Sequence, residues 1–477
     1  MTKTGDRVRF APSPTGFLHI GGVRTALYNW LWAKRTNGTF VLRIEDTDRE
    51  RSTQASVQAI FDSMKWCEME WDEGPLVGGP NGPYFQTERL ELYKQFADQL
   101  IDRGFAYRCY ATKEELDAER ERQKQAGNPY FKYPGWWRDK GPKDWPDSKP
   151  YVVRLKAPRS GSTGWNDVVK GRIDVPNDQQ QDVVLVRGDG VPLYNFGAVV
   201  DDVTMGITLV ARGDDHVVNT PVQILLYEAL GAKVPKFAHL PMILGQDGQK
   251  LSKRHAAVSV TEWRDAGYLP DAVLNYLARL GWSHGDAEKF SMAQLVEWFD
   301  LRHISKSPAR FDPEKLAWLN QQYLKEADDA RLAALMAPFL ERDGCVVAGG
   351  PDPRQVVGLL KERVSTIEEL ADAAVYFYRP LEPSAELRKT HYTAASRPAL
   401  AELHGRLAAI EWSRANISAA MKAVVAAQGL KFPQLAMPLR VMVTGEPQTP
   451  SVDATLELIG RERVLERMAA ELAHFQD

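Results

Sequence analysis

Apolar residues follow two kinds of spacing along the first part of the chain. Residues 8–11 form a short apolar run that predicts a β-strand, and apolar side chains recur at helical spacing over 23–33. An alternating run at 39–44 predicts a second strand, and 87–103 predicts an amphipathic helix. Strands that alternate with helices in this way are typical of an α/β fold with a parallel sheet.

The same alternation returns further along the chain. A strand is predicted at 207–211, the polar residues 212–216 follow it, and the periodic apolar segment 220–230 predicts a helix. We expect this unit to complete a Rossmann-type, doubly wound parallel sheet whose first half ends near residue 88. Residues 89–195 would then be an insertion between the two halves.

The insertion and the C-terminal part of the chain differ in pattern. Within the insertion we expect a strand-rich unit from about residue 151, with a strand at 183–186. From about 245 onward the spacing is helical, and beyond 326 it is helical almost throughout. The predicted organisation is a sheet domain in two halves at 1–88 and 196–244, the insertion at 89–195, a helical segment at 245–325 and an all-α region at 326–477.

Length and composition restrict the class of protein. A chain of 477 residues has room for roughly three domains with sizeable cores. Residues 1–9 are polar and charged, and no stretch of the chain approaches the roughly 20 apolar residues of a membrane span. The three cysteines lie too far apart in sequence for a disulfide framework. We therefore expect a soluble, cytoplasmic protein that has no membrane partner.

The net charge of −3 conceals an uneven distribution. Between residues 103 and 172 there are 16 Lys and Arg against 9 Asp and Glu, which leaves a surplus of 7 positive charges. Aromatic residues are interleaved with this charge, namely Tyr130, Phe131, Tyr133, Trp136, Trp137, Trp145 and Trp165. Cations with aromatic stacking platforms suit an RNA backbone with splayed bases. A solvated charged face over an ordinary core has the same composition, so this pattern alone leaves both interpretations open.

A turn rich in Gly and Pro at 12–22 links the first predicted strand to the first helix. Its prolines stop the strand because they fix φ and lack an N–H, and its glycines let a ligand approach bare backbone. The helix that follows would direct unpaired N–H groups and the positive end of its dipole at the turn, an arrangement that favours phosphate. His19 adds a side-chain donor there. A plain loop with a stray histidine is the alternative interpretation.

Acidic residues follow the second predicted strand. Glu45 lies just past its carboxyl end, where open α/β sheets bind their ligands, so it is placed to meet a ligand ammonium group. Asp46 and Asp48 come directly afterwards. For these two residues we favour the simpler interpretation that they cap the next helix.

A cationic loop follows the second half of the predicted sheet. Residues 245–254 contain glycines and end with Lys250, Lys253 and Arg254. Lysines on a mobile loop can close over a triphosphate and neutralise charge that develops in a transition state. A nuclear-localisation signal or a plain surface cluster is the alternative.

Two of these motifs together point to a family. The stretch at 11–22 and the loop at 250–254 resemble the HIGH and KMSKS motifs of class I aminoacyl-tRNA synthetases, and the whole chain resembles the bacterial glutamyl-tRNA synthetases. Shorter matches follow in the family's order, at 43–48, 199–202, 310–313 and 438–441. Each short match is weak, but their order and spacing along one chain make the resemblance strong.

The resemblance implies that ATP activates glutamate as glutamyl-adenylate, which then esterifies the 3′ end of tRNA(Glu). ATP, with Mg²⁺, would lie against His19, Gly21 and Gly22. The positions that match the family's ATP-binding loop are Lys250, Leu251, Ser252, Lys253 and Arg254. The positions that match its glutamate pocket are Arg9, Ala11, Ser13, Glu45, Tyr194 and Arg212. His19, Lys250 and Lys253 would be catalytic by positioning ATP and stabilising charge, since nucleotidyl transfer requires no protein nucleophile.

The remaining segments take their roles from the same resemblance. The insertion at 89–195 would bind the acceptor end of tRNA, 245–325 would contact its stem, and 326–477 would bind the anticodon. In this family the glutamate pocket becomes competent only when tRNA is bound. Amino-acid activation is therefore expected to depend on tRNA, and the enzyme is expected to be a monomer.

Arg212 is the residue that we expect to discriminate between glutamate and glutamine. A buried cation is satisfied by a γ-carboxylate and left unpaired by an amide, at a cost of several kcal/mol. Because glutaminyl relatives lack arginine at this position, we interpret the chain as a glutamate enzyme. The alternatives are a glutaminyl-tRNA synthetase, a shorter tRNA-modifying relative without an anticodon-binding region, and a catalytically silent tRNA-binding paralogue. The joint presence of His19, Lys250, Lys253 and Arg212 disfavours the silent paralogue.

The chain departs from the family pattern at a few positions. Gly22 replaces the second histidine of the HIGH motif, as it commonly does in glutamyl enzymes. Asp214 stands where Glu is more frequent, and Leu193 stands where Thr is common. We expect both changes to be mild.

A zinc site, which some members carry, is not expected here. The family's Cys-x-Cys pattern begins at Cys109, but position 111 is Ala111, and Trp136 and Trp137 occupy the place of another cysteine. One thiol cannot complete a tetrahedral zinc site.

Replacing Lys253 with alanine should slow adenylate formation by roughly 10²–10³-fold, the usual cost of losing one transition-state charge partner. The reason is the place of Lys253 in the loop that resembles KMSKS. Single-turnover measurement of adenylate formation, alongside glutamate affinity, checks this expectation. Glutamate binding should change far less, and an equal loss of ground-state affinity for glutamate would contradict the assigned role.

Overall fold

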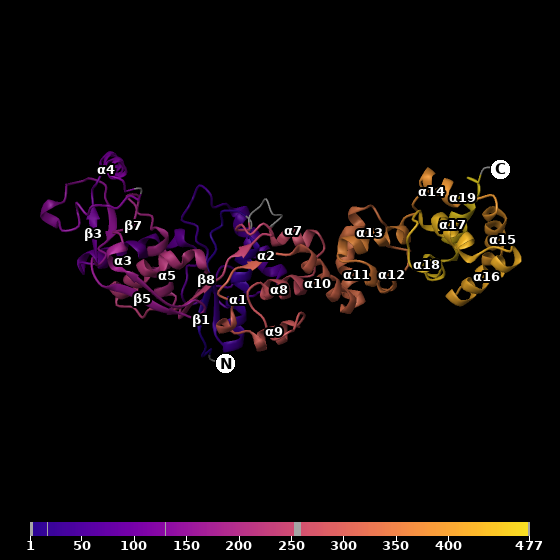
Figure 1. The fold of residues 1–477 in the computed structure, drawn as a ribbon, viewed down its shortest axis with the longest axis horizontal. Coiled ribbons are helices and arrows are strands. Elements are labelled where there is room, and N and C mark those ends of the chain that lie inside the picture. The colour runs from indigo at the N-terminus through magenta and orange to yellow at the C-terminus, as the bar shows by residue number, and fades with distance from the viewer. Residues whose placement is uncertain (1–2, 17, 129, 252–258, 476–477) are drawn as a thin grey trace. The chain divides into compact units, whose positions relative to one another are not determined.

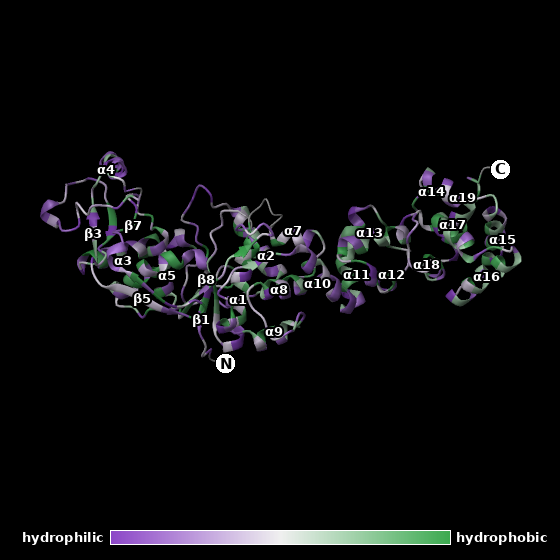
Figure 2. Ribbon diagram, viewed as in Figure 1, coloured by the Kyte–Doolittle hydropathy of each residue, from purple (hydrophilic) through white to green (hydrophobic). Residues whose placement is uncertain are grey.

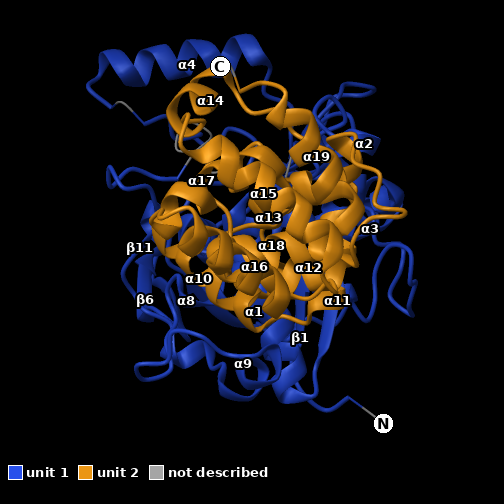
Figure 3. Ribbon diagram, turned by 90° about the vertical axis from the view of Figure 1, so that its right-hand side faces the viewer, with its two compact units in different colours: residues 1–263, 273–312 blue, residues 264–272, 313–477 orange. Residues whose placement is uncertain are grey.

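The protein divides into two compact units along the chain. In the computed structural model, which describes residues 3–475 apart from 17, 129 and 252–258, the first unit comprises Met1–Trp263 and Val273–Asp312. The second unit comprises Arg264–Ala272 and Pro313–Asp477 (Figure 3). Among the described residues, no helix combines the length and the apolar character that crossing a membrane requires.

Parallel strands form the centre of the first unit. They are β1 (Arg7–Phe10), β2 (Thr39–Leu42), β8 (Leu209–Gly213) and β9 (Lys236–Leu240). β1 pairs with β2, and β8 pairs with β9. The amide of Thr208 donates to the carbonyl of Arg7 (3.0 Å), so β1 and β8 lie side by side although the insertion separates them in sequence (Figure 1). The strands predicted from apolar runs are therefore confirmed, with ends shifted by a few residues.

Helices alternate with these strands, and the apolar periodicity predicted the first and the last of the four. They are α1 (Ile20–Thr36), α2 (Gln54–Trp66), α5 (Tyr194–Thr204) and α6 (Thr220–Leu230). In α1 the fully buried Val23, Leu27 and Leu31 recur every four residues and pack toward β1 and β8. α1 begins three residues before the predicted start, because the carbonyl of His19 accepts the first helical bond from the amide of Val23 (3.0 Å).

The prediction that Asp46 and Asp48 cap the next helix is wrong. α2 begins later, and its N-cap is Thr53, whose hydroxyl accepts from the amide of Ser56. Asp46 instead accepts from the amide (2.9 Å) and hydroxyl (2.6 Å) of Thr87. Asp48 accepts from the amide of Arg51 (3.2 Å) in the turn before the helix.

The segment between the two halves of the sheet has strands of its own. Its elements are α3 (Leu90–Asp102), β3 (Ala106–Cys109), α4 (Lys113–Gln125), β4 (Val152–Leu155), β5 (Ser162–Asp167), β6 (Gly171–Pro176) and β7 (Val184–Val186). β3, β4 and β7 form an antiparallel sheet, and β5 and β6 form a hairpin. The hydrophilic colour of α4 in Figure 2 matches its run of charged side chains.

The aromatic residues of this segment divide between core and surface. Tyr133 and Trp165 are buried, and the guanidinium of Arg154 lies 4.1 Å from the centre of the Tyr133 ring. Tyr130 and Trp136 are exposed, with 81% and 39% of their surface accessible. The interpretation as an ordinary core is therefore correct for the first pair, and only the second pair is exposed in the way a stacking platform requires.

The remainder of the first unit is mainly helical. Its elements are β10 (Ile243–Leu244), α7 (Val260–Asp265), α8 (Pro270–Arg279), α9 (Met292–Trp298) and β11 (Ala309–Arg310), with α7 and α8 extending across the division between the units. β10 and β11 pair in parallel. Trp282 is buried and packs against Phe290 and Phe299.

The second unit is built from helices around one apolar core, as predicted for the C-terminal part of the chain. Its helices include α10 (Pro313–Glu326), α11 (Asp329–Arg342), α12 (Pro353–Leu360), α13 (Ile367–Tyr378), α14 (Ala385–His391), α15 (Ser396–Ala409), α16 (Arg414–Ala427), α17 (Phe432–Thr444), α18 (Val452–Ile459) and α19 (Arg461–Leu472). Side chains of Asp328, Thr366 and Ser413 cap α11, α13 and α16. The core contains the fully buried Leu332, Leu370 and Leu400.

Candidate active site

A cavity of about 890 Å³ lies at the carboxyl ends of the parallel strands. The predicted site residues that line it are Arg9, Ala11, Ser13, His19, Gly21, Gly22, Glu45, Tyr194, Arg212, Lys250 and Leu251. The other three, Ser252, Lys253 and Arg254, lie outside the described residues. Residues far apart in sequence thus meet in one cavity, because parallel strands direct their carboxyl ends to the same edge of a sheet.

The first turn of α1 forms one wall of this cavity. His19 is its N-cap and is exposed, so the helix N-terminus opens into the cavity. A Cβ on Gly21 would meet nothing within 4 Å, so this position leaves open space beside the backbone. A Cβ on Gly22 would lie 2.9 Å from Cδ1 of Leu18, which explains why a histidine would not fit there without repacking.

Arg212 lies at the end of β8 and is buried, with 5% of its surface accessible. Its Nε donates to Nε2 of His239 (3.2 Å), its Nη1 to the hydroxyl of Tyr194 (3.3 Å) and its Nη2 to the hydroxyl of Thr220 (2.9 Å). Burial lowers the pKa of Arg212 from its ordinary value. Among the described residues its hydrogen-bond partners are all uncharged groups. These bonds use three of the five N–H donors of a guanidinium, so donors are left for a carboxylate.

Neutral and paired groups surround Arg212. The ring of His216 lies 5.2 Å from that of Tyr194, and burial together with the nearby Arg212 lowers the pKa of His216 to about 4. Lys170 pairs with Asp214 (2.9 Å), and Lys250 pairs with Asp215 (3.2 Å) within the cavity lining. Lys250 is largely exposed, so a stronger anion can draw it away from Asp215.

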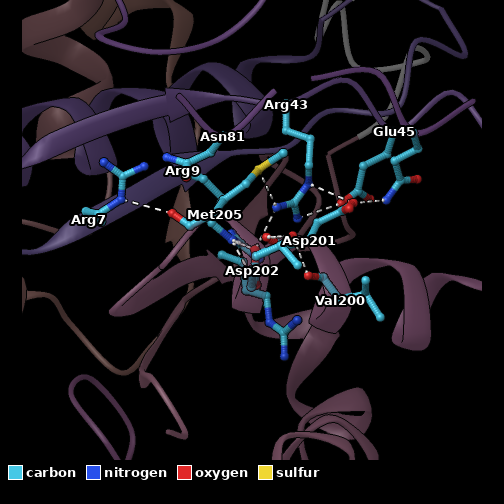
Figure 4. Close-up of polar contacts among 12 residues, drawn as sticks. Arg7, Arg9, Arg43, Glu45, Asn81, Val200, Asp201, Asp202 and Met205 are labelled. Carbon is cyan, nitrogen blue, oxygen red and sulfur yellow. Dashed lines mark hydrogen bonds and ion pairs between the residues drawn. The ribbon is translucent and has the colours of Figure 1, made fainter. Parts of the chain in front are cut away.

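A buried charge network lies directly behind the cavity. Arg43 has no accessible surface, and its Nη1 donates to Asp202 (2.7 Å) while its Nη2 donates to Glu45 (3.1 Å). Its Nε lies 3.5 Å from Asp201. Figure 4 shows the guanidinium directed at these carboxylates, of which Glu45 follows β2 and the two aspartates lie on α5.

Two more arginines complete the network. Arg9 donates to Asp202 (3.1 Å), and Arg89 donates to Asp201 (2.7 Å). Asp201 also accepts from Tyr93 (2.9 Å) and Gln86 (2.8 Å). Three guanidinium groups therefore face three carboxylates, so the charge is balanced within the buried cluster.

The sequence reasoning gave no role to Arg43, Asp201 or Asp202. The signal was present, because all three lie in the short family matches at 43–48 and 199–202. Of the cluster only Arg9 and Glu45 were singled out, and these are the two members that also line the cavity.

Burial raises the pKa of the carboxyl groups in this network, and pairing with arginine lowers it. Burial raises the pKa of Glu45, and the nearby Arg43 and Arg9 only partly oppose this. Burial would also raise the pKa of Asp202, but Arg9 and Arg43 hold it below its ordinary value. A cation that binds beside Glu45 would therefore stabilise the charged form of its carboxylate.

Cys109 is buried within the segment between the two halves of the sheet, and its thiol donates to the hydroxyl of Tyr133 (3.3 Å). Within the part of the chain that the structure describes, no group of three or more His, Cys, Asp or Glu side chains is arranged to hold a metal ion.

Known proteins match this chain along nearly its whole length. Residues 7–318 match the family of class I tRNA synthetases (E and Q), catalytic domain, and residues 315–472 match an anticodon-binding domain. The glutamate–tRNA ligase of Nitrosospira multiformis is 58% identical over 472 residues, which cover 98% of this chain and 99% of the relative. That of Nitrosomonas europaea is 57% identical over 470 residues, with 98% and 99% covered. The chain belongs to the class I tRNA synthetases of the E and Q group.

Solved structures agree with this membership. A glutamate–tRNA ligase from Elizabethkingia meningosepticum, crystallised in complex with its amino acid, superimposes with a TM-score of 0.89 at 34% identity. The match covers 99% of this chain and 100% of that structure. The predicted family and fold class, a class I catalytic domain followed by an anticodon-binding domain, are confirmed.

Within this catalytic domain, Arg43→Met should lower the free energy of unfolding by about 3–5 kcal/mol, because it leaves buried carboxylates without their shared cation. Methionine keeps much of the length of the side chain, so the lost charge is the main change. Urea unfolding of the full chain, followed through the transition of the first unit, measures the effect.

Arg51→Met is the matched control, because Arg51 is exposed and pairs with the exposed Asp48. This variant should unfold close to the wild type. Equal unfolding transitions for both variants and the wild type would show that the buried network does not stabilise the fold.

Proposed function

We propose that this protein attaches L-glutamate to the 3′ end of tRNA(Glu) in an ATP-dependent reaction that passes through glutamyl-adenylate. The observation that carries the proposal is Arg212, a buried cation in the cavity wall whose described hydrogen-bond partners are uncharged. A carboxylate supplies the missing counter-charge, whereas the amide of glutamine cannot.

Glutamate fits the cavity by charge at both ends. Arg212 takes the γ-carboxylate, and the hydroxyl of Tyr194, already bonded to Arg212 at 3.3 Å, lies beside it. Glu45 takes the α-ammonium, because burial raises the pKa of this carboxyl group despite its pairing with Arg43, and a further cation stabilises its charged form. Arg9 lines the same cavity and adds positive charge for the α-carboxylate.

ATP fits the wall formed by the first turn of α1. The unpaired N–H groups and the positive end of the helix dipole favour phosphate there, and the space beside Gly21 admits the nucleotide against bare backbone. His19 adds a donor, and Lys250 with Lys253 neutralises the triphosphate, which enters with Mg²⁺ as part of the substrate.

The chemistry then needs positioning and charge stabilisation. An oxygen of the α-carboxylate attacks the α-phosphorus of ATP, and pyrophosphate leaves with its charge met by the lysines. A ribose hydroxyl at the 3′ end of tRNA next attacks the activated carbonyl, and AMP leaves. No protein side chain is required as a nucleophile in either step.

Transfer RNA completes the set of partners. We assign residues 89–195 to its acceptor end, 245–325 to its stem and 326–477 to its anticodon. The exposed Tyr130 and Trp136 in the first of these segments offer stacking surfaces beside its excess of cations. We place the reaction in the cytoplasm, where thiols stay reduced, in line with cysteines that are all free. We also expect a monomer.

Arg212→Cys should weaken activity toward glutamate much more than activity toward glutamine. The variant removes a bidentate charge partner from a buried position, so the shift in preference should be large. Competition between the two amino acids in tRNA charging measures it. Arg7→Cys is a matched control, since Arg7 belongs to the same sheet but pairs with Glu73 (2.8 Å). If Arg212→Cys keeps the wild-type preference, Arg212 is not the selector.

Amino-acid activation itself should depend on tRNA, because the segment assigned to the acceptor end touches the cavity. Lys170 on this segment pairs with Asp214 of the cavity lining (2.9 Å), and Tyr194 at its exit bonds to Arg212. A shift of the segment on docking tRNA therefore moves residues of the pocket, and one arrangement can be productive only with tRNA bound.

Glutamate-dependent exchange of pyrophosphate into ATP, measured with and without cognate tRNA at saturating ATP and glutamate, tests this dependence. Exchange should be strong only with tRNA. Comparable rates in both reactions would mean that the segment docks tRNA without altering the pocket.

A further inference from the structure

One of the three hydrogen bonds of Arg212 is made to a histidine that is not among the described residues lining the cavity. His239 lies on β9, is fully buried, and accepts from Nε of Arg212 through its Nε2 (3.2 Å). The hydroxyl of Thr220 lies 3.1 Å from the same nitrogen. Since Nε of arginine is always a donor, Nε2 of His239 must carry a lone pair and its proton must be on Nδ1.

Asp167 at the end of β5 holds that proton in place. Its Oδ2 lies 2.5 Å from Nδ1 of His239, and its Oδ1 accepts from the amides of Val169 (3.0 Å), Lys170 (2.9 Å) and His239 (3.2 Å). Burial alone would raise the pKa of Asp167, but these hydrogen bonds lower it to about 2, so the carboxylate is ionised. Burial lowers the pKa of His239, which keeps the imidazole neutral.

The ring of His239 is also fixed by its neighbours. It stacks on Phe237 at a centroid distance of 6.1 Å, with 10° between the planes, and meets the edge of Trp165 at 6.3 Å. Arg212 lies over the same Phe237 ring, 5.6 Å from its centroid. The imidazole therefore has one orientation, and only its tautomer remains to be set.

We propose that Asp167 is a positioning residue for amino-acid selection, which orients Arg212 by fixing the tautomer of His239. Asp167 is not among the described residues that line the cavity, and it lies on the segment between the two halves of the sheet. The relay consists of two hydrogen bonds, in which Nδ1–H of His239 donates to the carboxylate of Asp167 and Nε–H of Arg212 donates to Nε2 of His239. It therefore joins that segment to Arg212. The negative charge stays one ring away, so the terminal nitrogens of Arg212 keep their attraction for a substrate carboxylate. This inference rests on the proposed role of Arg212 in selecting glutamate.

Asp167→Asn tests the relay with almost no change of shape. The three backbone amides that meet Oδ1 require an acceptor, so the new amide oxygen takes that place. Its NH₂ then faces Nδ1 of His239 and also Nε1 of Trp165, which donates to Oδ2 of Asp167 (3.3 Å). His239 must then accept at Nδ1 and carry its proton on Nε2, where it opposes the N–H of Arg212. We expect KM for glutamate in tRNA charging to rise about 10–100-fold, with KM for ATP within about twofold of wild type. Preference for glutamate over glutamine should fall as well.

Asp174→Asn is the matched control. Asp174 lies on β6 of the same hairpin, is exposed and pairs with Arg172, so its loss removes the same charge without touching the relay. This variant should keep the wild-type KM for glutamate. Thermal unfolding of both variants separates a change in selection from a loss of folded protein.

A double-mutant cycle decides whether Asp167 acts through His239. In His239→Gln the side-chain amide can rotate to offer an acceptor to Arg212 whatever Asp167 carries, so Asp167→Asn should add little in that background. An equal rise of KM in both backgrounds, or no rise in the single variant, would overturn the proposal.

If Arg212→Cys leaves the preference for glutamate unchanged, the proposed function fails at Arg212. If Arg212→Cys changes it and Asp167→Asn does not, only the relay fails.

Discussion

The buried guanidinium of Arg43 is the interaction on which the rest of the first unit depends. It meets Glu45, Asp201 and Asp202, and all four side chains are almost without accessible surface. Removing charge from water is expensive, and the cost is offset only when each carboxylate keeps its cation and its hydrogen bonds. Arg43 and Glu45 come just after β2, and the two aspartates lie on α5 beyond the segment at 89–195, so the network joins the two halves of the sheet.

The same network sets the electrostatics of the cavity. Arg9 and Glu45 belong both to the buried cluster and to the cavity lining, so their hydrogen bonds within the cluster fix their positions in the cavity wall. Arg212 differs from the arginines of the cluster, because its hydrogen-bond partners among the described residues are uncharged. The buried cluster is neutral in sum, whereas Arg212 forms no ion pair among the described residues, so the cavity strongly attracts a substrate carboxylate.

The sequence predicted the parts of the site that follow from strand ends and motifs. Glu45 was found because it comes just after an apolar strand, and Arg212 because it matches the glutamate pocket of the family that the chain resembles. The structure brings both to the same cavity. Asp46 was wrongly predicted to cap a helix, because its partner Thr87 is 41 residues away and no local sequence pattern predicts that contact. His239 and Asp167 were missed for the same reason: 72 residues separate them, and neither belongs to a motif. The burial of Tyr133 and Trp165 likewise cannot be inferred from composition, which is the same for a core and for a stacking surface.

Hydrogen bonds connect the inserted segment to the pocket beside ring contacts such as that of Tyr194 with His216, and through these hydrogen bonds the two can influence each other. Asp167 meets His239, and Lys170 meets Asp214, through hydrogen bonds that weaken steeply when their geometry changes. An apolar contact would tolerate a small sliding movement with little change in free energy. A movement of the β5–β6 hairpin that barely alters the packing would therefore still change the alignment of Arg212 and Asp214. Two discrete arrangements of these bonds are enough to make binding at one site favour binding at the other, and by reciprocity a bound glutamate would hold the hairpin in the arrangement that it prefers.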